Sequence, residues 1–333
     1  MNTSAGATTD GIVAVGLRKS YGDKTVLDGV DLHIPQGTVF SLLGPNGAGK
    51  TTTVQILSTL IPADGGEARV AGHLVDREAD AVRSAIGVTG QFSAVDNLLT
   101  AAENMMLVAD LLHLPKDEGR RRTADLLARF DLTDVADKPA STFSGGMRRK
   151  LDLAMTLVGR PSVIFLDEPT TGLDPASRRN LWDIIQDLVS DGVTIFLTTQ
   201  YLEEADHLAD RIALLDGGRI VAEGTPDELK RRIPGGHIRL RFADQYRFEN
   251  ASRVLAEAVR DEESLILQIA SDGSIPALRG LLGRLEDAGI DAEELTVHTP
   301  DLDDVFLALT GRRKAGPADE AAHSKKAAKE FTR

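Results

Sequence analysis

The chain has 333 residues, of which 42% are hydrophobic and 27% charged, a balance typical of globular proteins and not of disordered or membrane-spanning ones. Acidic residues outnumber basic ones by 51 to 38, and the net charge of -13 argues against a nucleic-acid partner. The absence of cysteine excludes disulfides, thiolate nucleophiles and cysteine-bound metals. At about 150 residues per domain, the length predicts about two domains.

Apolar runs alternate with amphipathic helical stretches over residues 12–232, as in an α/β domain with a largely parallel sheet. Continuous apolar runs predict strands buried on both faces at Val39 to Leu43, Val163 to Leu166 and Val193 to Leu197. Residues 1–11 lack the basic flank and apolar segment of a signal peptide and are expected to be disordered. The uncharged stretches are interrupted by Pro and Gly and fall short of the ~20 apolar residues of a membrane span.

A smaller α/β domain is predicted at residues 233–311, after a turn at Ile233 to Gly236. Its pattern favours three strands and two helices, in the order His237 to Ala243, Ala251 to Val259 (helix), Leu265 to Ala270, Ile275 to Ala288 (helix) and Leu295 to His298. A ferredoxin-like arrangement is one candidate for this domain. Residues 312–333 are charged or small and are expected to form a disordered tail.

The last helical segment, Asp301 to Thr310, carries one apolar face formed by Leu302, Val305, Phe306 and Leu309. This face has two interpretations. It either closes the small domain or contacts another subunit.

The strongest chemical signal is the run Gly44-Pro45-Asn46-Gly47-Ala48-Gly49-Lys50-Thr51, which matches the phosphate-loop pattern G-x-x-x-x-G-K-[ST]. It lies between a buried strand and the helical stretch Thr52 to Leu60. The glycines let consecutive N–H groups point at phosphate oxygens, and the helix N-terminus adds a positive partial charge. Lys50 adds a full charge, and the Thr51 hydroxyl is a suitable ligand for Mg²⁺. The run therefore predicts a nucleotide site.

Two adjacent acids follow the predicted strand Val163 to Leu166, and strand ends of open α/β sheets are where ligands bind. We expect Asp167 to hold Mg²⁺ and Glu168 to orient and deprotonate the water that attacks the γ-phosphate. Solvated acids at a strand end are the plain alternative, and the phosphate loop upstream argues against it.

The run Phe143-Ser144-Gly145-Gly146-Met147 predicts a second anion site, because Ser144 is a good helix N-cap and the glycines expose N–H groups at a helix start. The alternative is an ordinary capped helix. The run resembles the signature motif of ATP-binding cassette (ABC) ATPases, usually Leu-Ser-Gly-Gly-Gln, with Phe143 and Met147 as departures. Its position just before the acidic strand fits that family.

Further elements of the ABC pattern occur in family order over residues 12–228. By this resemblance Tyr21 stacks on adenine, Gln91 contacts Mg²⁺ and the attacking water, and Asp174 communicates across a dimer; taken alone, a tyrosine near a strand is more often a packed ring. The resemblance implies a P-loop ABC cassette with a helical insert at about residues 100–160. It also implies a nucleotide-binding set consisting of Tyr21, Gly44, Asn46, Gly47, Ala48, Gly49, Lys50, Thr51, Thr52, Ser144, Gly145, Gly146 and Asp174. The implied catalytic residues are Lys50, Gln91, Glu168 and Gln200. The implied metal-binding residues are Thr51, Gln91 and Asp167.

Gln200 follows the strand Val193 to Leu197 at the position where the family usually has histidine. Its amide can donate a hydrogen bond to a γ-phosphate but cannot gain or lose a proton near neutral pH. We hypothesise that Glu168 provides the base and that Gln200 only positions phosphate.

Within the superfamily the chain is similar to ATP-binding subunits of daunorubicin/doxorubicin-resistance exporters. The shared segments are Val88-Thr89-Gly90-Gln91, Thr198-Thr199-Gln200-Tyr201-Leu202 and Leu302 to Thr310. The resemblance implies a head-to-tail homodimer that clasps MgATP between the phosphate loop of one copy and Ser144 to Gly146 of the other.

The same resemblance implies a membrane permease, seated on Thr100 to Ala140 near Phe92, that exports a hydrophobic drug or antibiotic. The subunit would then lie peripherally on the cytoplasmic face of the cell membrane. The alternative is a soluble ABC ATPase that acts as a dimerisation switch without transport. A single cassette without sustained heptads favours the transporter.

Overall fold

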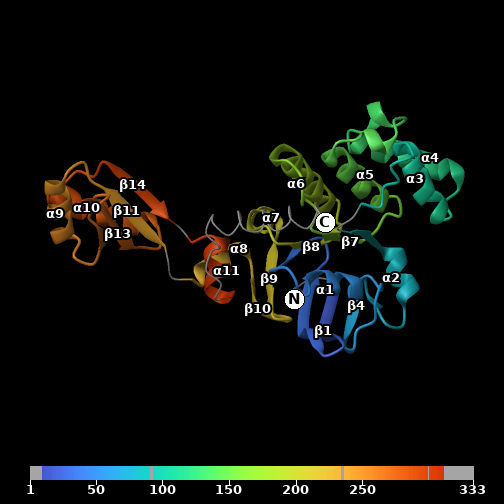
Figure 1. Cartoon of the computed structure of the whole chain (residues 1–333), viewed down its shortest axis with the longest axis horizontal. Coiled ribbons are helices and arrows are strands. Elements are labelled where there is room, and N and C mark those ends of the chain that lie inside the picture. The colour runs from blue at the N-terminus through green and yellow to red at the C-terminus, as the bar shows by residue number, and fades with distance from the viewer. Residues whose placement is uncertain (1–9, 91–92, 234–235, 299, 311–333) are drawn as a thin grey trace, which may run out of the picture. The chain divides into compact units, whose positions relative to one another are not determined.

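The computed structural model describes residues 10–90, 93–233, 236–298 and 300–310 (Figure 1). The chain divides into two compact units between Pro226 and Asp227. Residues 234 and 235 of the predicted linker lie outside the described residues, as do residues 1–9 and the predicted tail 312–333. Asp10 and Gly11, which we expected to be disordered, are instead the first residues of strand β1 (Asp10–Tyr21) because they pair with neighbouring backbone.

The larger unit is built on a six-stranded sheet with the order β10-β9-β3-β8-β7-β6. Neighbouring strands from β9 to β6 run parallel, and β10 pairs antiparallel to β9. The strands are β3 (Val39–Leu43), β6 (Ile86–Thr89), β7 (Val163–Asp167), β8 (Thr194–Thr199), β9 (Arg211–Asp216) and β10 (Arg219–Gly224). Every residue of β3, β7 and β8 is buried, as expected for parallel strands covered on both faces.

Successive side chains of β7 point into two different hydrophobic cores, because strand residues alternate between the faces of a sheet. Ile164 and Leu166 belong to the core that contains helices α5 (Gly145–Leu157) and α6 (Pro175–Ser190). Val163 and Phe165 belong to the core that contains α1 (Lys50–Leu57). Helices α1 and α5 therefore pack on opposite faces of the six-stranded sheet.

An antiparallel sheet with the order β2-β1-β4-β5 shares the core of α1. Its other strands are β2 (Lys24–Pro35), β4 (Gly65–Val70) and β5 (His73–Leu74). On the opposite side, α3 (Ala101–Leu111) and α4 (Lys116–Arg129) pack with α5 in the core that lies across the sheet. Thr100 starts α3 with a capping box to Glu103. The remaining helices of this unit are α2 (Ala79–Ala85), α7 (Leu202–Leu208), and the 3₁₀ turns Thr133–Val135 and Ala140–Thr142.

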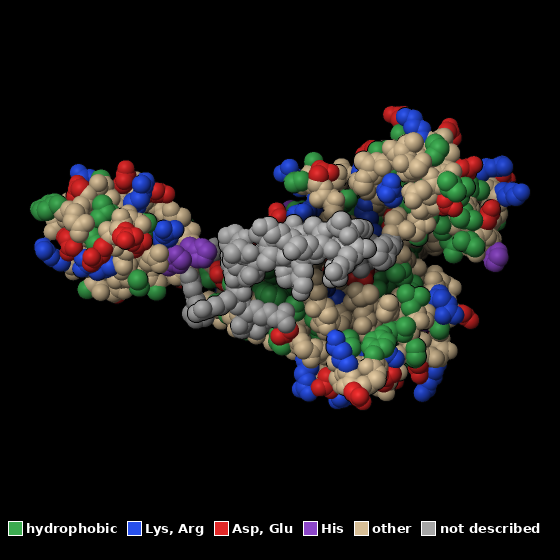
Figure 2. All heavy atoms as spheres, viewed as in Figure 1, with side chains coloured by type: hydrophobic (Ala, Val, Ile, Leu, Met, Phe, Trp, Pro, Cys, Tyr) green, Lys and Arg blue, Asp and Glu red, His purple; other side chains and the backbone are tan. Residues whose placement is uncertain are grey.

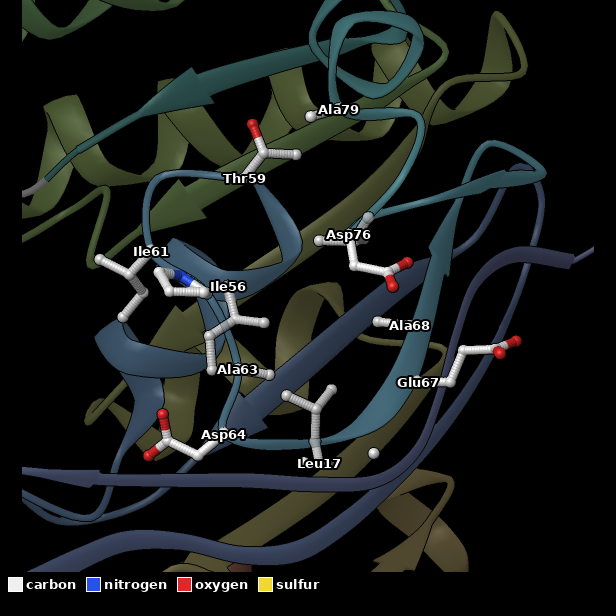
Figure 3. A pocket seen from close by; sticks show the side chains of 14 residues that line it. Leu17, Ile56, Thr59, Ile61, Ala63, Asp64, Glu67, Ala68, Asp76 and Ala79 are labelled. Atoms are coloured by element: carbon white, nitrogen blue, oxygen red, sulfur yellow. The ribbon is translucent and has the colours of Figure 1, made fainter.

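A cavity of about 400 Å³ lies beside β1, β4 and the end of α1 (Figure 3). Aliphatic side chains such as Leu17 and Ile56 line it, and the carboxylates of Asp64 and Glu67 lie toward opposite sides of the view. Asp64 is held by Lys19 Nζ at 2.8 Å. None of the residues predicted to bind nucleotide lines this cavity.

The smaller unit contains one antiparallel sheet with the order β12-β13-β11-β14. Its elements are β11 (His237–Arg241), α9 (Gln245–Val254), β12 (Val259–Asp261), β13 (Ile266–Ala270), α10 (Ile275–Asp287) and β14 (Glu294–His298). This βαββαβ order is the ferredoxin-like arrangement. The predicted helix Ala251 to Val259 was misplaced, because Phe248 and Ala251 anchor an earlier helix, and Val259 begins a short strand that the pattern did not reveal.

Two more helices, α8 (Pro226–Arg231) and α11 (Leu302–Thr310), complete the described chain. In α11, Leu302 and Val305 are buried, whereas Leu309 is exposed. In the described part of the chain, every helix is too short or too polar to cross a bilayer.

Candidate functional site

The segments that carry the predicted chemistry leave the sheet from adjacent parallel strands. The phosphate loop follows β3, Asp167 ends β7 and Glu168 follows it, Gln200 follows β8, and Gly90 follows β6. Because β3, β8, β7 and β6 are parallel neighbours, their carboxyl ends lie on one edge of the sheet. Gln91, the residue after Gly90, lies outside the described residues.

Glycines shape the phosphate loop. Gly47 and Gly49 have φ of 80° and 113°, in the region that residues with a side chain rarely adopt. A Cβ on Gly44 would lie 2.3 Å from the carbonyl oxygen of Leu215, so the loop passes too close to β9 for any larger residue. Of the other predicted loop residues, the buried ones are Ala48 and Lys50, the half-buried one is Thr52, and the exposed ones are Asn46 and Thr51.

Lys50 is held inside its own loop. Its Nζ donates hydrogen bonds to the carbonyl oxygens of Gly44 at 2.8 Å and Pro45 at 3.3 Å, and it lies 3.6 Å from Oε1 of Glu168. Burial lowers the pKa of Lys50, and the carboxylates of Glu168 and Asp167 oppose this shift. A phosphate would be a stronger, charge-assisted partner than the neutral carbonyls.

Asp167 and Glu168 are fixed by Thr198 at the end of β8. Thr198 Oγ1 donates a hydrogen bond to Asp167 Oδ1, and the backbone N–H of Glu168 donates to the Thr198 carbonyl at 3.0 Å. The buried Asp167 carboxylate and the exposed Thr51 hydroxyl are hard oxygen donors. They fit Mg²⁺, which is usually bound by few protein oxygens and by substrate phosphates.

The predicted second anion site begins helix α5. Ser144 caps the helix by accepting a hydrogen bond from the N–H of Met147 at 3.2 Å, and both Ser144 and Gly145 are exposed. A Cβ on Gly146 would lie 2.6 Å from Oγ of Ser177, so α5 approaches α6 closely at this glycine. Since α1 and α5 lie on opposite faces of the sheet, this helix tip is separate from the phosphate loop of the same chain.

Asp174 caps α6 and is hydrogen-bonded to Ser177, the residue that Gly146 approaches. Its Oδ1 accepts hydrogen bonds from the N–H groups of Ala176 and Ser177, each at 3.0 Å, and its Oδ2 accepts from Ser177 Oγ at 2.6 Å. The hydrogen bonds from Ser177 lower the pKa of Asp174. Ser177 therefore joins the exposed Asp174 to Gly146.

Other predicted residues are exposed. Tyr21 is 51% exposed, so its ring is not a core side chain, and Lys19 Nζ lies 5.6 Å from the ring centroid. Gln200 is also exposed. Sequence reasoning missed Thr198 and Arg149; a threonine after an apolar strand and an arginine one turn into a helix are weak signals, and only the fold places them against Asp167 and Pro169.

An ABC transporter family model matches residues 27–171. The chain is 49% identical over 302 residues to a daunorubicin resistance ATP-binding protein of Streptomyces coeruleorubidus, covering 90% of this chain and 96% of the relative. The chain belongs to the ATP-binding subunits of ABC transporters. This ABC subunit is also 45% identical over 325 residues to the daunorubicin/doxorubicin resistance ATP-binding protein of Streptomyces peucetius, covering 96% of each.

Solved structures place this ABC subunit in the same fold. A dimeric ATP-binding cassette in a post-hydrolysis state, bound to ADP and Pi, has a TM-score of 0.58 and 26% identity, over 64% of this chain and 98% of that one. The ATP-binding subunit of an ABC transporter gives a TM-score of 0.60 at 28% identity, over 66% and 92%. The predicted cassette fold and ATPase class are confirmed.

Proposed function

We propose that this ABC subunit hydrolyses MgATP between two copies of itself and thereby drives efflux of a hydrophobic drug through a separate membrane permease. The observation that carries the proposal is the meeting of Lys50, Asp167 and Glu168 at one sheet edge. Relatives named for daunorubicin and doxorubicin resistance, matched over nearly their whole length, support a drug as the cargo. None of these observations favours a soluble switch.

The residues of the site divide the chemical work. Lys50 and the N–H groups of the phosphate loop bind the phosphates, and the exposed ring of Tyr21 is available to adenine. Thr51 and Asp167 would hold Mg²⁺, which when bound neutralises phosphate charge. Glu168 accepts a proton from the attacking water, and the Gln200 amide donates a hydrogen bond to the γ-phosphate.

Two copies are needed because the two anion sites belong to opposite faces of one sheet. In a head-to-tail pair, the tip Ser144 to Gly146 of one copy, exposed at Ser144 and Gly145, would close over the nucleotide on the phosphate loop of the other. ATP then stabilises the dimer, and its hydrolysis releases the pair. Asp174, joined to the tip through Ser177, lies on the same closing surface.

Glu168→Gln tests this arrangement by separating binding from turnover. We expect the ATPase rate to fall at least ~100-fold, because the amide cannot accept the proton, while MgATP shifts the variant to a dimer in analytical ultracentrifugation. Adding Ser144→Arg should abolish the ATP-dependent dimer and leave the binding of a fluorescent ATP analogue intact. Full turnover by Glu168→Gln, or a dimer indifferent to Ser144→Arg, would refute the proposal.

Exposed leucines of α3 are the proposed seat of the permease at the cytoplasmic face of the membrane. Leu107 and Leu111 are 45% and 69% exposed and share one helix face at i, i+4 spacing. Figure 2 shows hydrophobic side chains exposed among charged ones over α3 and α4. Burial against a permease helix would remove this apolar surface from water.

The permease contact is tested by co-purification with the product of a neighbouring gene that encodes about six apolar spans of ~20 residues. Leu107→Asp/Leu111→Asp should lose this partner and keep the ATPase rate of the isolated chain. Leu282→Asp, at a leucine of α10 that is 48% exposed, should keep it. Retention of the permease by the double variant would contradict the contact.

A further inference from the structure

Arg149 and Asp152 form a buried ion pair within α5. Their side chains are only 10% and 3% exposed, and Arg149 Nη1 lies 3.1 Å from Asp152 Oδ2. Arg149 also donates from Nε to the Pro169 carbonyl at 2.8 Å and from Nη1 to the Gly90 carbonyl at 3.0 Å. One guanidinium thus joins α5 to the backbone that follows β7 and to the backbone that follows β6.

Asp152 adds a second contact to the segment after β6. Its Oδ1 accepts a hydrogen bond from the N–H of Ala94 at 3.0 Å. The pair therefore holds described backbone on both sides of residues 91–92, at Gly90 and Ala94.

A buried ion pair of this kind contributes little net stability. Taking both charges out of water is costly, and well-packed apolar residues of similar size would usually serve the core equally well. Nη2 of Arg149 is buried with no hydrogen-bond partner, so the guanidinium is not placed for full satisfaction. Its position is instead set by the two carbonyls that it reaches.

The Pro169 carbonyl follows a strained residue. Glu168 has φ of 49°, which is unfavourable for a side-chain-bearing residue, and a residue before proline ordinarily prefers an extended backbone. The Thr198 carbonyl accepts a hydrogen bond from the N–H of Glu168, and Arg149 donates one to the carbonyl of Pro169. Strain of this kind persists where the surroundings impose it, most often at functional sites.

We propose that the buried Arg149–Asp152 pair of α5 is a positioning pair, which holds the strained Glu168–Pro169 backbone in the orientation that ATP hydrolysis requires. The inference rests on the proposed function of Glu168. It also links the helix that begins at Ser144, through the Pro169 carbonyl, to the backbone next to the proposed base of its own chain.

The test compares kcat, KM for MgATP and Tm in the purified full chain. Arg149→Met/Asp152→Leu removes both charges together and avoids an unpaired buried ion. We expect kcat to fall at least tenfold while KM and the Kd of a fluorescent ATP analogue stay within about twofold of wild type. Arg149→Lys keeps the charge beside Asp152 but cannot reach both carbonyls as a planar fork does, so its kcat should be intermediate.

The matched control is Arg122→Met. Arg122 likewise pairs with a carboxylate on its own helix, Glu118, and donates to a backbone carbonyl, but that carbonyl belongs to Val158 and not to the backbone next to Glu168. The Arg122→Met variant should have a lower Tm than wild type and an unchanged kcat. A wild-type kcat in the folded double variant would overturn the inference. If the double variant fails to fold, a wild-type kcat in Arg149→Lys would overturn it instead. Glu168→Gln is measured in the same assay to test the proposed function separately. Full turnover by Glu168→Gln would show that Glu168 is not the base, whatever the Arg149 variants do.

Discussion

Lys50 and Glu168 meet across the site, with Nζ and Oε1 3.6 Å apart and side chains only 4% and 11% exposed. The lysine begins α1 on one face of the sheet, and the glutamate follows the buried strand β7. The pair therefore connects the element proposed to bind phosphate to the element proposed to activate water. A phosphate in the loop would compete with Glu168 for the ammonium, so nucleotide binding and exposure of the carboxylate to water are linked.

Lys50→Met should abolish ATP hydrolysis, with a rate at least ~100-fold below wild type, because the charge facing the phosphates is lost. The measurement is phosphate release by the purified chain at saturating MgATP. Lys116→Met, at an exposed lysine of α4, is the control and should hydrolyse ATP normally. Substantial residual turnover in Lys50→Met would show that the phosphate loop is not where ATP reacts.

Thr198→Val should raise the Mg²⁺ concentration that gives half-maximal ATPase rate by about tenfold. The hydroxyl orients Asp167 through its hydrogen bond, and loss of such an outer partner typically weakens a metal site by this amount or more. Thr194→Val removes a buried hydroxyl from the other end of the same strand and should leave the Mg²⁺ requirement unchanged. Equal Mg²⁺ curves for the two variants would contradict a role of Asp167 in holding the ion.

Gln200→His should keep the pH optimum of ATP hydrolysis if, as proposed, Glu168 supplies the base and position 200 only orients phosphate. Gln200→Ala, which removes the donor, should lower kcat about tenfold. Both variants are followed by steady-state kinetics from pH 6 to pH 9. A substantially displaced optimum in Gln200→His would assign proton transfer to this position.

Glu204→Gln should stabilise the protein increasingly as the pH rises from 5 to 8. The side chain is fully buried, and burial raises the pKa of Glu204 above its ordinary value of 4.5, against the hydrogen bond from Trp182 Nε1. A raised folded-state pKa contributes stability that is present below the unfolded value and lost as the pH rises through the folded one. The amide oxygen of Gln can accept the same hydrogen bond without that loss.

The readout for Glu204→Gln is Tm as a function of pH, with an expected gain on the order of a few °C at pH 8 and little at pH 5. Glu203→Gln is the control, since the side chain of Glu203 is 75% exposed and its charge stays in water. A gain that is the same at every pH would mean that Glu204 is not the titrating group.

Much of the fold is local in the chain and was predictable. The runs that became β3 and β7 are continuously apolar because both faces of a parallel sheet are covered, and that requirement shows directly in the sequence. Strand β12 was missed because all three of its residues are exposed, which leaves no alternation to detect. Its place comes from pairing with β13.

The sequence by itself determined which residues form the phosphate loop and the acidic pair, because each is a short continuous run whose residues stay neighbours in any fold. Only the tertiary structure decided that Thr198 supports Asp167, that Arg149 supports Pro169, and that the tip at Ser144 lies across the sheet from α1. Those relationships join residues far apart along the chain. They depend on strand order and on which face each side chain meets, and a linear pattern does not encode either.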